Sequence, residues 1–352
     1  MSKLLSLSSD KNWIFGFKID LILFSGTLIL SYLFILLFYF IGYDFNTLAP
    51  IWLIPLLHII SDGSHIFSTF YRIRHDSRNQ KLQYLVLFLV VIILNSLIFG
   101  YNANIYAHYL ALFAVYHFAR QQYGWFMISS RKCHGHQDYN YNWDRVIIYN
   151  STLTPVLIWM CQPSDTYGWF NIGDLFNLNS PDLIQYIKIF HFLLLTVYFI
   201  HEYQNYKKTK FIPLAKYHIL TVTWLIWYPS LAYFQKHIIG LILFALSHGI
   251  QYMYITFKYE QEHAQNKKIA SERLYPILYF IIALIAFFEV IYNKQFSNLV
   301  NKQELPFWLV VIGTGFINSF QITHYILDGF LWKPSKDQNI SSFLGLTNEK
   351  RN

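Results

Sequence analysis

Three ionisable side chains follow one another within an otherwise apolar stretch of the chain. His58, Asp62 and His65 stand at positions i, i+4 and i+7. On a helix that advances ~100° per residue, these three side chains fall on one face. The pattern His-x-x-x-Asp-Gly occurs a second time, at His324 and Asp328. Imidazole and carboxylate groups that face one another can bind a metal ion or relay protons, so both stretches are candidates for chemistry.

The elements that carry these residues are predicted to span a membrane. Of the 352 residues, 55% are hydrophobic and 13% are charged. That is about half of the ~25% charged residues of an ordinary soluble domain. Apolar runs close to the ~20 residues that cross a bilayer recur along most of the chain. We therefore expect an all-α, polytopic membrane protein that forms a single transmembrane domain over residues 1–352.

The apolar runs predict about ten transmembrane helices. They cover residues 17–42, 48–71, 82–101, 105–129, 146–162, 183–203, 211–234, 238–257, 274–292 and 307–332. With a cytoplasmic N-terminus, the Lys and Arg clusters fall on the cytoplasmic side, and the outer loops contain Lys236, Lys294 and Lys302. This distribution follows the positive-inside rule, so we expect both termini to be cytoplasmic. It also accounts for the net charge of +8 without binding of nucleic acid.

The predicted spans bring four histidines to a similar depth. His65, His117, His248 and His324 lie in the second, fourth, eighth and tenth spans, which all run in the same direction. At a rise of 1.5 Å per residue, each lies roughly 10–18 Å from the cytoplasmic end of its helix. An ionisable group in hydrocarbon is costly unless it is paired, hydrated or bound. We therefore expect the four imidazoles to face one another inside the bundle.

Histidine and aspartate together form the set of candidate metal ligands, which comprises His58, Asp62, His65, His117, His248, His324 and Asp328. Nitrogen and oxygen donors suit iron first, with zinc, manganese or copper as alternatives, and the set is large enough for one ion or two. His58 lies about 10 Å further from the cytoplasmic end than His65. It is therefore a candidate outer ligand, a partner of a ligand, or a ligand of a second ion. A single buried histidine is more often a hydrogen-bonded core residue, which is our interpretation of His108, His191 and His237.

Four further polar residues are candidates for catalytic roles. Arg120 and Gln121 follow His117 by three and four positions, and Gln251 and Tyr252 follow His248 by the same intervals. Each pair shares a helix face with its histidine, so these side chains can orient ligands, bind a polar group of a substrate or supply a proton. Arg120 fits equally well as a boundary residue whose charge reaches the membrane surface.

Motifs for other kinds of chemistry are absent from the sequence. It contains no Gly-rich phosphate loop, no Gly-x-Ser-x-Gly elbow and no His-Glu-x-x-His motif, so nothing supports ATP-driven transport or serine hydrolysis. Cys133 and Cys161 are the two cysteines, and we expect neither a disulfide framework nor a thiolate metal site.

The stretch His58-x-x-x-Asp62-Gly63-Ser64-His65 resembles the histidine-rich integral-membrane metal oxygenases. It is more similar to the bacterial carotene-cleaving dioxygenases, which place His and Asp within transmembrane helices, than to the fatty-acid desaturases and hydroxylases. The chain departs from the desaturases because it has no His-x-x-His-His box. The similarity covers motifs on four spans, and it implies a metal site that activates O₂ near an apolar substrate.

These observations predict an integral-membrane oxidoreductase in which iron, held by His and Asp, activates O₂ beside a lipid, fatty acyl chain, isoprenoid or carotenoid. The cytoplasmic depth of the site suits electron delivery by a soluble donor. Three alternatives use the same residues: a haem protein with two axial histidines, a proton-coupled carrier, and a metal transporter.

Overall fold

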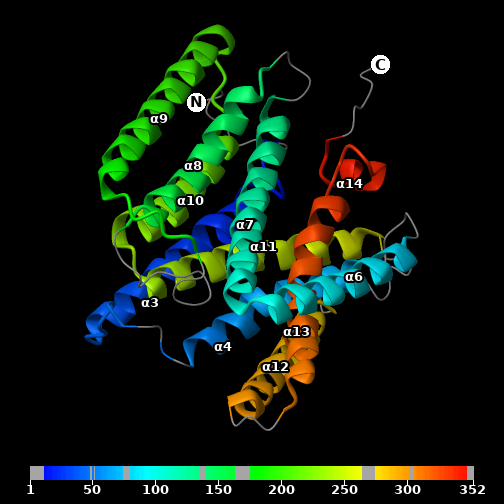
Figure 1. The fold of residues 1–352 in the computed structure, drawn as a ribbon. Helices are drawn as coiled ribbons and strands as arrows, with labels where there is room; N and C mark the ends of the chain where they lie inside the picture. Colours follow the sequence, from blue (N-terminus) through cyan, green and yellow to red (C-terminus); the bar gives the residue numbers. More distant parts are fainter. Residues whose placement is uncertain are drawn as a thin grey trace.

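The computed structural model describes residues 12–47, 50, 52–73, 80–134, 139–162, 175–263, 274–301 and 305–346. Every regular element in these ranges is a helix (Figure 1). The first long helical runs are α2 (Phe17–Asp20), η3 (Leu21–Gly26) and α3 (Thr27–Phe40), followed by α4 (Leu53–Leu57), η4 (His58–Asp62) and α5 (Gly63–Ile73). The elements named η are π-helical turns within longer helices. The next helices are α6 (Lys81–Tyr101), α7 (Ala103–His134), α8 (Asn142–Met160) and α9 (Pro181–Thr209). The remaining elements are α10 (Leu214–Trp227), η5 (Tyr228–Phe234), α11 (His237–His263), α12 (Leu274–Asn301), α13 (Phe307–Leu331) and α14 (Gln338–Phe343).

The all-α fold class is confirmed, and a helical run lies within each of the ten ranges predicted from the apolar pattern. The second range was predicted to begin at Leu48, which lies outside the described residues, as does Lys302. The short helix α14 was not predicted, because it contains six residues and no apolar run. Both cysteines are free and buried.

Four helices among the described residues are long and apolar enough to cross a membrane. They are Phe17–Phe40, Lys81–Tyr101, Pro181–Thr209 and His237–Glu262. In the most apolar part of these helices, 78% of the residues are buried in α11, against 17% in α6 and 11% in α9. Large apolar side chains are therefore exposed along α6 and α9, such as Leu85 and Phe190, as expected of surfaces that face lipid.

Helix α11 lies at the centre of the fold. It packs against α3, α5, η4 and α10, and Figure 1 shows it crossing the middle of the bundle while α9 lies at the edge. The approach of α11 to η4 is close because Gly249 has no side chain: a Cβ there would lie 2.5 Å from the carbonyl oxygen of Ser61. The hydroxyl of Ser61 donates a 2.6 Å hydrogen bond to the carbonyl of Ala245, which fixes the same contact.

A buried ion cluster joins α8, α9 and α10. Lys216 is fully buried, and its Nζ lies 3.3 Å from Asp144 Oδ1 and donates to Glu202. The Tyr139 hydroxyl contributes to the cluster by donating to Glu202 Oε1 at 2.8 Å. The structure pairs Lys216 with two carboxylates, which is how charges are accommodated in an apolar interior.

Candidate metal centre

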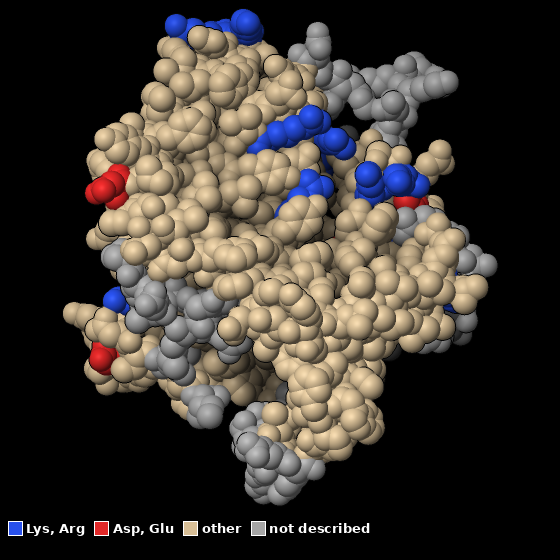
Figure 2. All heavy atoms as spheres, viewed as in Figure 1, with Lys and Arg blue, Asp and Glu red and all other residues tan. Residues whose placement is uncertain are grey.

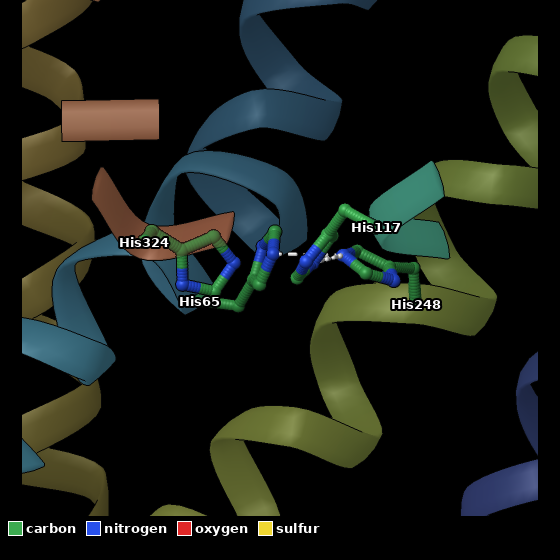
Figure 3. Close-up of side chains that lie close together, drawn as sticks. All are labelled: His65, His117, His248 and His324. Atoms are coloured by element: carbon green, nitrogen blue, oxygen red, sulfur yellow. Dashed lines mark hydrogen bonds between the residues drawn. The ribbon is translucent and has the colours of Figure 1, made fainter. Parts of the chain in front are cut away.

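Four histidines from four helices converge in the interior of the bundle. His65 comes from α5, His117 from α7, His248 from α11 and His324 from α13, and all four side chains are buried. Figure 3 shows their rings turned toward one another. The Nε2 atoms of His65 and His248 are 2.8 Å apart, and those of His117 and His248 are 3.2 Å apart. One ring nitrogen of each histidine lies within 4.8 Å of the others, so the four imidazoles face one another as expected.

The spacing of these nitrogens fits a metal ion. Metal–nitrogen bonds of ~2.0–2.1 Å separate neighbouring ligand atoms by roughly 3.0–3.4 Å, depending on geometry. The two measured separations, 2.8 and 3.2 Å, lie close to that range. The four described imidazoles can therefore close on one ion with little movement.

Hydrogen bonding among the imidazoles is a poorer explanation of the cluster. The Nε2 atom of a neutral imidazole carries either one hydrogen or one lone pair. The Nε2 atom of His248 faces the Nε2 atoms of both His65 and His117, so it cannot make a full hydrogen bond with each of them. Nε2 of His324 is buried and has no hydrogen-bond partner among the described residues. A bound cation would satisfy all four nitrogens at once, whereas burial of unpaired polar atoms is costly.

The outer nitrogen of His324 is held by a hydrogen-bond network. Thr69 Oγ1 lies 2.6 Å from His324 Nδ1, and it also approaches Tyr252 OH at 2.7 Å. The Tyr252 hydroxyl donates to Asp328 and accepts a 3.0 Å hydrogen bond from Trp332 Nε1. Outer partners of this kind fix the orientation of a ligating imidazole.

Asp328 and Asp62 both lie next to the four histidines. Asp328 Oδ2 is 3.9 Å from His117 Nε2, and Asp62 Oδ1 is 3.9 Å from His65 Nδ1. Both carboxylates are therefore adjacent to the cluster. Asp328 is placed to join the ligands after a small shift, and Asp62 is placed to orient His65.

His58 lies outside the group of four. Its Nδ1 is 3.6 Å from Asp62 Oδ2, and its Nε2 is 2.8 Å from Glu289 Oε2 on α12. The ring folds back over its own helix at Gly63, where a Cβ would lie 2.3 Å from His58 Nε2. Sequence reasoning missed Glu289, although it is a lone carboxylate within an apolar stretch of the predicted ninth span, which is the signal that identified the other residues.

The four catalytic candidates are placed differently from one another. Tyr252 belongs to the network around Asp328, and the side-chain amide of Gln121 donates to the backbone carbonyl of His248 at 3.1 Å. Gln251 instead donates to the carbonyl of Leu23 and to Thr27, on the side of α11 that faces α3. The Arg120 side chain donates to the Tyr149 hydroxyl and is exposed, so it has no contact with the histidine cluster.

The three histidines interpreted from the sequence as core residues have other surroundings. His191 accepts a 3.0 Å hydrogen bond from Trp224 Nε1, as expected for a core histidine. His108 stacks on Phe176 with ring centroids 4.4 Å apart, and His237 lies at the start of α11.

A cavity of about 250 Å³ lies beside the histidine cluster. Its walls include Asp62, Ile66 and Phe118, and the Phe118 ring stacks on His248 with centroids 3.8 Å apart. Along α11 the wall is formed by positions 237, 240, 241, 244 and 245, which is a single helix face. The next position on that face is His248, so the cavity runs along α11 toward the cluster.

Comparisons of the chain with protein-family models, with curated proteins and with solved structures find no match.

Proposed function

We propose that this protein is a membrane-embedded, metal-dependent oxidoreductase that uses O₂ to act on an apolar substrate. One observation carries the proposal: four buried histidines on four helices direct ring nitrogens to a common point next to a largely apolar cavity. Intramembrane ionisable residues are costly and are usually functional.

The four histidines would hold the metal. Iron is our first choice for the nitrogen donors with a carboxylate close by, and zinc, manganese and copper are the other candidates. A bound iron ion supplies O₂ activation and redox chemistry that no side chain offers. We infer that the substrate is a lipid, fatty acyl chain, isoprenoid or carotenoid, and that a soluble donor supplies electrons.

The protein's own residues have defined tasks in this proposal. Thr69, with Asp328 nearby, orients His324, and Asp62 orients His65. The Tyr252 hydroxyl donates to Asp328 and so holds this carboxylate next to His117. Apolar walls such as Phe118 and Ile66 exclude water from the side of the cluster that faces the cavity.

We further infer that ten helices cross the membrane and that both termini are cytoplasmic. The last turns of α7 and α9 carry Arg131, Lys132, Lys207 and Lys208. On the face seen in Figure 2, most Lys and Arg side chains lie in the upper half of the molecule, while residues without charge cover most of the middle. A basic end next to a region with few charges agrees with the positive-inside rule.

A bare metal ion fits the site better than haem does. The ring centroids of His65 and His248 are 4.3 Å apart, and those of His117 and His324 are 4.7 Å apart. Imidazoles packed this closely on several sides occupy the volume that a macrocycle between two axial ligands requires. The other alternative is a transporter that moves metal ions or protons through the same layer of histidines. A transporter would carry these ions across liposome membranes, whereas the proposed enzyme retains its metal ion tightly.

Elemental analysis and an optical spectrum of the anaerobically purified protein test the proposal. We expect nearly one tightly retained iron per chain in the wild type and in His108→Ala, and loss of that iron in His117→Ala, which alters the same helix. The loaded wild type should consume O₂ in the presence of one of the four apolar substrate classes. Absence of metal from a folded wild type, or no O₂ uptake with any class, would refute the assignment.

A further inference from the structure

The Asp62 carboxylate lies between two histidines and close to both. Its Oδ1 lies 3.9 Å from Nδ1 of His65, and its Oδ2 lies 3.6 Å from Nδ1 of His58. Each imidazole thus presents Nδ1 to the same carboxylate. A carboxylate at the outer nitrogen is the usual partner of a metal-ligating histidine, because it fixes the tautomer and the ring orientation.

The Nε2 atoms of His65 and His58 face different groups. Nε2 of His65 belongs to the four-histidine cluster, whereas Nε2 of His58 lies 2.8 Å from Glu289 Oε2. His58, Asp62 and Glu289 all line the cavity. Their side chains remain 21%, 26% and 19% exposed, so an ion or water in the cavity can reach them.

The charge of this group is unbalanced among the described residues. Asp62 and Glu289 contribute two negative charges when ionised, and His58 between them is neutral or singly positive. The lysine of the cavity wall, Lys236, donates to Asn46 at an exposed position. Carboxylates that face an apolar interior require a cation or a proton.

The distance between His58 and Glu289 suits ligation. Neighbouring ligand atoms of one ion lie about 3 Å apart when metal–ligand bonds are ~2.0–2.2 Å. The measured separation of 2.8 Å is close to this value. Two protein ligands also leave positions open for water or substrate in the cavity.

We propose that His58 Nε2 and Glu289 form a second site, for a divalent transition-metal ion, which Asp62 connects to the four-histidine centre. Asp62 orients one ligand of each site through its two oxygens. The second site is more open than the first, so it binds its ion more weakly. Its existence does not depend on the oxidoreductase activity proposed above.

Titration of the chelator-stripped full-length protein with Co²⁺ tests this site, with bound metal measured by equilibrium dialysis and elemental analysis. We expect two equivalents in the wild type and one in Glu289→Gln and in His58→Gln. His237→Ala, which alters another histidine of the same cavity wall, should retain two. Helical circular dichroism and the elution profile in detergent establish that each variant is folded.

Each outcome has a defined meaning. The second site would be refuted if the wild type binds one equivalent of Co²⁺ and Glu289→Gln binds the same amount. The contact between His58 and Glu289 is then a hydrogen bond alone. His248→Ala should lose the tighter equivalent and keep the one that depends on Glu289. If the wild type binds one equivalent that requires Glu289 but not His248, the second site stands and the four-histidine centre fails.

Discussion

Replacement of Gly249 by alanine is the sharpest test of how the proposed metal centre is held. Gly249 directly follows His248 on α11, and it packs on Ser61, four residues before His65. An alanine Cβ would lie 2.5 Å from both the carbonyl oxygen and the hydroxyl oxygen of Ser61. Ordinary contacts begin near 3.4 Å, so the two helices must separate by roughly 1 Å, at a cost of about 1–3 kcal/mol for an overpacked contact.

That separation acts directly on two of the proposed ligands, His65 and His248. The Nε2 atoms of His65 and His248 are 2.8 Å apart, and a metal site tolerates deviations of about 0.2 Å in its bond lengths. We therefore expect Gly249→Ala to weaken metal binding at least tenfold, about 1.4 kcal/mol.

The assay is competition with a chelator at known free metal concentration. Gly240→Ala is the matched control, because it lies on the same helix and its Cβ would meet nothing within 4 Å. If Gly249→Ala binds the metal as tightly as Gly240→Ala does, the contact between η4 and α11 does not position the ligands.

Three further predictions follow from the same structure. Asp62→Asn should weaken the four-histidine centre by about 10–100-fold in chelator competition, because it removes the carboxylate at His65 Nδ1; unchanged affinity would contradict that role. Lys216→Met should destabilise the fold by about 3–5 kcal/mol in denaturant titrations, since it leaves two buried carboxylates unpaired. Lys258→Met, which breaks an exposed pair, should cost less than about 1 kcal/mol. Burial, with Lys216 nearby, lowers the pKa of His134 at the end of α7 to about 4. The unfolded chain, with the pKa near 6.5, binds the proton first, so stability should fall by roughly 2 kcal/mol from pH 7 to 5, and less in His134→Gln.

The sequence predicted the helices and the four histidines for a simple reason. Membrane-crossing helices are long, and the rise per residue converts position into depth, so His65, His117, His248 and His324 could be aligned without a structure. Convergence followed because each imidazole needs a polar partner in an apolar interior.

Helix faces were harder to predict than depth. Gln251 and Tyr252 follow His248 by three and four residues, so they diverge by ~60° and ~40° to opposite sides of it. In the structure Gln251 faces α3, and Tyr252 faces α5 and α13. The neighbours of α11 decide which of these directions leads to the site, and a single sequence does not contain that information.

His58 shows how a local departure from the α-helix redirects chemistry. On a regular helix, His58 and His65 share a face, which is why both were included among the candidate metal ligands. The structure instead has a π-helical turn over His58–Asp62. A π-helical turn accommodates one additional residue, which rotates the preceding part of the helix by roughly 100° relative to the regular form. His58 consequently turns toward Glu289 and the cavity, while Asp62, at the end of the turn, lies 3.6 Å from His58 and 3.9 Å from His65. The same turn brings Ser61 against Gly249, so one local feature both packs η4 against α11 and directs His58 away from the four histidines.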